Sequence, residues 1–224
     1  MTSIIFFKFN KNLWWAFTQM GIHKDFLKSI DGQKFYKMLG TGSDPGFSMY
    51  PDFYTYALLQ VWESSSQFEK FFQSNKYLET FLSKSTQHRI ILLSNFRSTG
   101  FWDGINPFLN STLTESYNVS DKIAVITRGT INFNKLIHFW LSIKKSSEAI
   151  SSAKGVSFFK GIGELPFIQQ ATFSIWDSEK HINSFAYSNI DHKEIINKTR
   201  RQKWYKEDLF ARFHIIKDSD FISR

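Results

Sequence analysis

Short apolar runs separated by amphipathic segments follow one another in the first 97 residues. The apolar runs fit buried or half-buried strands, and the apolar residues of the amphipathic segments recur at helical spacing. The pattern predicts strands over residues 4–9, 33–40, 53–62 and 88–96, and helices over 13–30 and 64–84, with Asn10 or Asn12 able to cap the first helix. The order βαββαβ is that of the ferredoxin-like or split βαβ arrangement.

The same order of elements returns in the second half of the chain. Strands are predicted over 122–131, 155–163, 169–176 and 208–216, and helices over 134–150 and 177–204, the second of these with a kink near residues 188–189. The intervening segment, 98–121, is polar and contains glycines, which is typical of a linker. Its aromatic residues Phe101, Trp102 and Phe108 indicate that it packs on the rest of the protein.

Two stretches resemble each other across the halves. FYKMLGTG at 35–42 matches FFKGIGEL at 158–165, so that Lys37 and Lys160 are equivalent strand positions. Each stretch is followed by a strand ending in Trp, an acidic residue and Ser, and then by a Phe nine residues after the Trp (Phe71 and Phe185). The match favours an internal duplication. The two lysines are either solvated strand ends or part of a site.

The duplication predicts an α+β fold in which two ferredoxin-like βαββαβ repeats form a dimeric α/β barrel-like domain. Its parts would be residues 1–97, a linker over 98–121, and residues 122–224. Two open sheets can bury their apolar faces against each other by closing a barrel, and an apolar cavity is then expected between sheet and helices.

Composition narrows the classes of function. The chain has a net charge of +8, but its basic residues are scattered, so we predict no nucleic-acid partner and allow contact with a membrane surface. It contains no cysteine, which excludes disulfides, thiolate catalysis and iron–sulfur clusters. There is no run of 18 apolar residues and no signal-peptide pattern, so we expect a cytoplasmic location, with peripheral contact at the inner membrane as the alternative.

Two residues stand out as candidates for chemistry. His192 shares one face of the last predicted helix with Phe185 and Ile196, so it faces the sheet either as a core histidine or as an axial ligand of haem iron. Arg200 and Arg201 follow, and would pair haem propionates or lie in solvent. Arg128 shares a strand face with Ile126, and as a buried charge it needs a partner such as Glu164 or Asp177, unless its stem reaches solvent.

Several motifs are similar to those of the spheroidene monooxygenase family. The most specific are the run from Lys160 to Trp176 and WYKEDLFARF at 204–213, and the others include Thr127-Arg128, Gln170, His192 and the W-x-G-x-x-P-F arrangement from Trp102 to Phe108. The resemblance covers nearly the whole chain.

The resemblance implies a dioxygen-dependent monooxygenase that contains haem b and oxidises an acyclic carotenoid by hydroxylation and ketone formation. It also implies an electron donor such as a ferredoxin, and a homo-oligomer is compatible with it. We expect His192 to be the metal ligand, Lys160, Arg200 and Arg201 to bind the cofactor, and Arg128 and Gln170 to act in catalysis by hydrogen bonding to dioxygen. The alternative is a non-catalytic protein that binds haem or another apolar ligand in the same pocket.

Overall fold

Two repeats of the predicted order build the chain. The structure, a computed structural model, describes residues 1–43, 50–109, 120–188 and 203–223. The elements of the first repeat are β1 (Thr2–Lys8), α1 (Leu13–Ile22), α2 (Lys24–Leu27), β2 (Gln33–Gly42), β3 (Pro51–Trp62), α3 (Ser65–Ser74), α4 (Lys76–Lys84) and β4 (Gln87–Gly100). Those of the second are β5 (Ile123–Ile131), a 3-10 turn (Phe133–Lys135), α5 (Leu136–Ser151), β6 (Val156–Gly163), β7 (Gln169–Trp176), α6 (Glu179–Ser188) and β8 (Tyr205–Asp218), followed by β9 (Ile222–Ser223).

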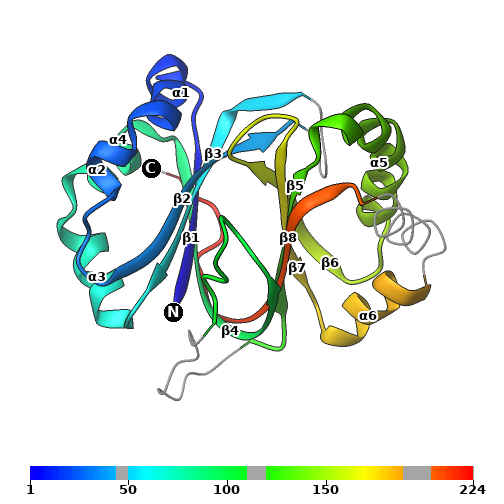
Figure 1. Cartoon of the computed structure of the whole chain (residues 1–224). Helices are drawn as coiled ribbons and strands as arrows, with labels where there is room; N and C mark the ends of the chain where they lie inside the picture. Colours follow the sequence, from blue (N-terminus) through cyan, green and yellow to red (C-terminus); the bar gives the residue numbers. More distant parts are fainter. Residues whose placement is uncertain (44–49, 110–119, 189–202, 224) are drawn as a thin grey trace.

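The strands form one antiparallel sheet that closes on itself. Its order is β1-β3-β2-β6-β7-β5-β8-β4-β9, and β1 also pairs with β4, so eight strands make a barrel and β9 extends the edge of β4. Within each repeat the strand order is that of a ferredoxin-like unit, which confirms the predicted α+β class with an eight-stranded barrel. The helices of the two repeats lie on opposite sides of the strands (Figure 1).

The two junctions between the repeats differ in length. On one side β4 pairs with β8 from Ile91 to Gly100, whereas on the other β2 and β6 meet only at Gly40–Gly163 and Thr41–Ile162. We call this short β2–β6 junction the seam.

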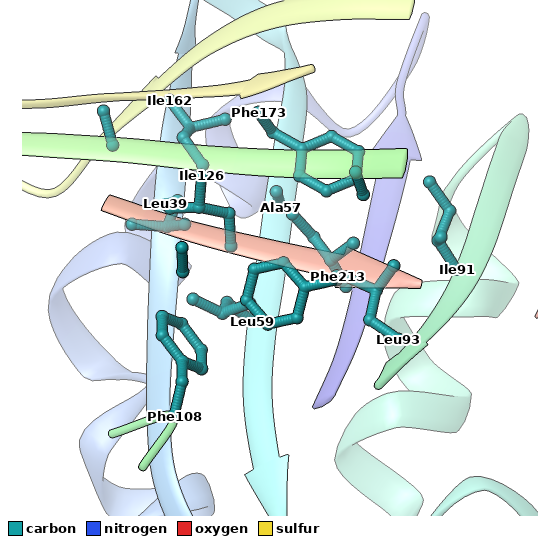
Figure 2. Close-up of a cluster of buried hydrophobic side chains, with 14 of the residues drawn as sticks. Leu39, Ala57, Leu59, Ile91, Leu93, Phe108, Ile126, Ile162, Phe173 and Phe213 are labelled. Carbon is teal, nitrogen blue, oxygen red and sulfur yellow. The ribbon is translucent and has the colours of Figure 1, made fainter. Parts of the chain in front are cut away.

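The inside of the barrel is a packed core. Alternate residues of the strands point inward, so one face of every strand contributes to a single cluster of fully buried side chains. Leu59, Ile126 and Phe213 gather there from both repeats (Figure 2). The barrel is therefore filled with side chains, and space for a ligand has to be found on its outside.

The outer faces of the strands pack against the helices in a way that repeats between the halves. Trp62 contacts Phe71 with ring centroids 5.1 Å apart at 42°, and Trp176 contacts Phe185 at 5.3 Å and 40°. These are the Trp and Phe residues that the sequence repeat aligns, so the two halves also share the distance and angle at which these rings pack.

Helix boundaries depart from the sequence prediction: the single helix predicted over 13–30 is divided at His23 into α1 and α2 and ends at Leu27. The helix predicted over 64–84 is divided at Asn75, whose side-chain oxygen accepts a hydrogen bond from the backbone N–H of Leu78 at 2.9 Å and begins α4. Asn12 stands at the N-terminus of α1 but does not cap it, because its φ is 61° and its amide donates to Lys84 O instead.

The linker begins later than predicted and enters the barrel. Residues 98–100 continue β4, and at Gly100, where φ is +87°, a Cβ atom would lie 2.1 Å from Asp208 O, so only glycine fits. Trp102 and Phe108 are then buried in the barrel core, as the aromatic residues of this segment had suggested, while Phe101 is exposed.

Candidate functional site

A cluster of charges closes one end of the barrel, beside the buried Trp102. Lys37 of β2 forms ion pairs with Asp103 of the linker and with Glu164, which follows β6. Glu164 also accepts a hydrogen bond from Trp102 Nε1 at 2.7 Å. The sequence motifs around Trp102, Lys160–Trp176 and Trp204–Phe213 thus meet at this cluster, which we call the barrel-end cluster.

Arg128 completes the barrel-end cluster. Its side chain is 2% exposed and forms an ion pair with Glu207 of β8, with its guanidinium 5.5 Å from the Trp102 ring centroid. The inward face and the need for a partner were predicted correctly, but the partner is Glu207 rather than Glu164 or Asp177, because β5 pairs with β8 and places Arg128 opposite the start of that strand.

Glu207 is held as a carboxylate by several donors. Burial alone would raise its pKa, but hydrogen bonds from the backbone N–H groups of Gly104 and Asp103 and from Arg128 lower the pKa below its ordinary value. The two backbone donors lie 2.7 and 2.9 Å from its oxygens. The linker is therefore tied to β8 by a charged group inside the fold.

The equivalent lysines Lys37 and Lys160 are not solvated strand ends. Each reaches across the seam to a carboxylate of the other repeat, Lys37 to Glu164 and Lys160 to Asp52 at 2.9 Å. Although burial raises the pKa of Asp52, hydrogen bonds from Lys160 and from the backbone N–H of Tyr54 bring it below its ordinary value. The repeated lysines therefore connect the two halves.

A small apolar cavity lies between the second repeat's sheet and its helices, where the sequence led us to expect one. It measures about 110 Å³, and we call it the C-terminal cavity. Its walls include Phe159, Trp176 and Phe185, and the hydroxyl-bearing residues Thr127, Thr172 and Ser174 also line it. Thr127 belongs to the outer face of β5, so its neighbour Arg128 points to the opposite side of the sheet.

A larger pocket of about 270 Å³ lies over the seam, and we call it the seam pocket. It is lined by α1, by the ends of β2 and β6, by the beginning of β3 and by the β6–β7 loop. The carboxylates of Asp52 and Glu164, both held in ion pairs, line it together with Phe17, Gly40, Phe53, Gly163, Phe167 and Gln170. Trp140 of α5 donates a hydrogen bond to Phe167 O at 3.2 Å, which anchors the loop. Sequence reasoning missed Phe17 and Phe53, although half-exposed aromatic residues on a helix and at a strand end are a usable signal.

The predicted site residues are thus divided among three places. Gln170 lines the seam pocket, whereas Lys160 and Arg128 lie on the barrel side of the sheet in ion pairs. His192, Arg200 and Arg201 lie outside the described residues. Within the described ranges, no group of three or more histidine or acidic residues could hold a metal ion, and no helix is long and apolar enough to cross a bilayer.

The fold assigns the chain to a structural class. No family model matches the chain. Among solved structures, aldoxime dehydratase superposes with a TM-score of 0.63 at 11% identity, covering 100% of this chain and 84% of that one. A complex of aldoxime dehydratase with butyraldoxime gives a TM-score of 0.57 at 12% identity, covering 96% and 79%. At such identities the likeness shows a shared α+β barrel fold and nothing about chemistry.

Sequence comparison then shows which proteins the chain resembles along its length. The chain is 28% identical to spheroidene monooxygenase of Rhodobacter capsulatus over 218 residues, which are 96% of this chain and 90% of that protein. It is 32% identical to spheroidene monooxygenase of Cereibacter sphaeroides over 212 residues, 94% of this chain and 64% of that protein. The chain is thus similar to spheroidene monooxygenases over almost its whole length, as its motifs had indicated.

Proposed function

We propose that this protein is a monooxygenase that oxidises a carotenoid or a similar long apolar substrate with dioxygen. The observation that carries the proposal is the match to spheroidene monooxygenases along almost the whole chain. Apolar space on the outside of the barrel supports it, because a long hydrocarbon needs aromatic and aliphatic walls.

The proposed reaction needs electrons and a lipid-dissolved substrate, both of which come from outside the protein. Inserting one oxygen atom into a C–H bond gives an alcohol, and the second oxygen atom leaves as water after taking up two electrons and two protons. A small electron-transfer protein of the ferredoxin class would deliver the electrons. A substrate dissolved in lipid also favours transient contact with a membrane surface, to which the net charge of +8 would contribute.

We propose that haem binds at the C-terminal cavity because of the character of its walls, and since the described residues enclose only about 110 Å³ there, the group would extend beyond them. Aromatic and aliphatic side chains suit the faces of a porphyrin, and the cavity lies on the predicted side of the sheet. We propose that His192 would supply a nitrogen ligand to the iron and that Arg200 and Arg201 would pair the propionates, since no histidine of the described residues lines the cavity. Bound there, haem would supply the activation of dioxygen.

The roles of the other predicted residues depend on which face of the sheet they occupy. Gln170 lines the seam pocket from the outer face of β7, one outward position before Thr172 of the C-terminal cavity, and we propose that its amide hydrogen-bonds a ligand that extends from one space toward the other. Arg128 and Lys160 are on the barrel face and are already paired. We therefore keep Gln170 in the proposed site and assign Arg128 and Lys160 to holding the fold.

The proposal is tested by an absorption spectrum, which detects bound haem, and by an assay of product formation. Protein from haem-supplemented cells should show a Soret band that is lost or shifted in His192→Ala and unchanged in His138→Ala, a control in which an exposed histidine of α5 is replaced. With spheroidene, a reductase and ferredoxin, and ¹⁸O₂, the product should gain one labelled oxygen atom. A Soret band without product would leave a haem-binding protein, and neither band nor product would overturn the proposal.

A further inference from the structure

We infer that the seam pocket is a binding site for the chain of a long acyclic polyene. It would hold the part of the molecule that extends away from the C-terminal cavity. The inference rests on the proposed function for the identity of the ligand, but the argument for a site comes from the seam itself.

The seam is the place where the barrel is least closed. The β4–β8 junction continues over Ile91–Gly100, whereas β2 and β6 share two residue pairs before their ends diverge. Helix α1 of the first repeat and the β6–β7 loop of the second both line the seam pocket, so its walls come from both halves of the chain. Pockets between repeats are common ligand sites for this reason.

Glycine keeps the floor of the seam pocket open. Gly163 is required by packing, since a Cβ atom there would lie 2.6 Å from Gln169 O. Gly40 is different: its φ is not in the left-handed region, and an added Cβ would meet nothing nearer than Gly163 O at 3.8 Å. Since neither the backbone conformation nor a neighbouring atom demands glycine at position 40, the missing side chain leaves room for a ligand.

The entrance to the seam pocket is aromatic and accessible. Phe17, Phe53 and Phe167 line it and are 45%, 48% and 44% exposed. The rings of Phe17 and Phe53 pack edge to face, 5.8 Å apart, which holds this side of the entrance together. Exposing three phenylalanines around one pocket leaves apolar surface that a hydrocarbon would cover.

The length of the ligand follows from the position of the two cavities on β7. Gln170 belongs to the seam pocket, and the next outward residues on the same strand, Thr172 and Ser174, belong to the C-terminal cavity. Strand residues on one face lie roughly 7 Å apart. A ligand that lies in the seam pocket and points its end along β7 toward the C-terminal cavity, where the proposed haem would be, must therefore be long and narrow, as an extended polyene is.

Gly40→Leu is the decisive variant, because its side chain fills the seam pocket from the floor. The matched control is Gly21→Leu, which places the same side chain on α1 where nothing lies within 4 Å. The probe is cis-parinaric acid, a linear fluorescent polyene, titrated into each purified protein. We expect Gly40→Leu to weaken binding about tenfold or more, as overpacking implies, and Gly21→Leu to leave it unchanged. Equal binding by both variants would overturn the inference.

A second variant and the choice of probe distinguish a loss of binding from a loss of folding or of catalysis. If Gly40→Leu has a lower melting temperature than the wild type, a second variant is used. Phe53→Ser removes part of the pocket wall at an exposed position and should also weaken probe binding. Unchanged binding by Phe53→Ser would count against the site. Because the titration needs neither haem nor dioxygen, a protein that binds the probe and forms no product would contradict the proposed function alone. Normal turnover of spheroidene by Gly40→Leu would contradict the seam site alone.

Discussion

Individual buried charges in this protein are matched rather than solvated. The Arg128 side chain is 2% exposed and pairs with Glu207. The Lys37 side chain is 15% exposed and pairs with two carboxylates. Leaving one partner of such a pair alone inside a protein is far more costly than removing a surface pair. The barrel-end cluster should therefore be sensitive to single substitutions.

Glu207→Gln tests this cluster. The variant removes the carboxylate paired with Arg128, leaving Asp103 at 3.6 Å, and turns one of its two oxygens into an N–H₂ group that faces a backbone N–H donor, so we expect a loss of about 2 kcal/mol of unfolding free energy at pH 7. Since the folded pKa of Glu207 lies below its ordinary value of 4.5, its contribution is present above pH 4.5 and disappears as pH falls through the folded pKa.

Urea denaturation between pH 3 and 7 measures both effects. The stability difference between wild type and Glu207→Gln should shrink on acidification. Glu69→Gln, at an exposed position of α3, is the control and should change stability by less than about 0.5 kcal/mol at any pH. A difference that stays constant with pH would show that the charge of Glu207 is not what stabilises the cluster.

At the scale of elements, strand alternation decides what each side chain can reach. Along β5, Ala124, Ile126 and Arg128 face the barrel core while Val125 and Thr127 face the C-terminal cavity. A shift of one residue in register would exchange the two sets. The alternation could be read from the sequence, but which face carries the cavity could not.

Helix termini are the second feature at this scale. Asn75 ends α3 and caps α4, so Asn75→Ala should cost about 1 kcal/mol of unfolding free energy, because the backbone N–H of Leu78 loses its acceptor. Asn75→Asp retains an acceptor oxygen and should stay close to the wild type. Thermal unfolding of the wild type and the two variants measures this effect. Identical midpoints would mean that the start of α4 does not depend on the Asn75 cap.

At the scale of the molecule, the two repeats share one core and should unfold together. Leu59 and Ile126 come from different repeats and lie in the same buried cluster. We expect Leu59→Ala and Ile126→Ala each to cost about 3 kcal/mol, through lost burial and the cavity left behind. Each variant should melt in a single transition by calorimetry.

Two separated transitions in either variant would show that the repeats fold as independent units. Leu141→Ala is a suitable control, because this leucine of α5 is 78% exposed and its loss should be nearly neutral. The long β4–β8 junction and the lysines that cross the seam are the physical reasons to expect one unit.

Much of the fold was predictable because local signals agree with it. The eight barrel strands, the repeat, and the inward face of Arg128 followed from periodicity, and the likeness to spheroidene monooxygenases followed from short motifs. The sequence was less informative where an interaction depends on distant residues: Asn12 does not cap α1 and its amide donates to Lys84 O, and Lys160 forms an ion pair with Asp52 of the other repeat, so its role at the cofactor stays a prediction.

The sequence by itself determined the order of elements, the internal repeat and the likeness to spheroidene monooxygenases, since these depend on residues close together in the chain or on matching segments. Only the tertiary structure decided that Glu207 is the partner of Arg128, that Trp102 and Phe108 enter the barrel, and that Gln170 belongs to the seam pocket. Barrel closure brings residues more than a hundred positions apart into contact, as with Lys37 and Glu164, and no local pattern encodes such a pairing.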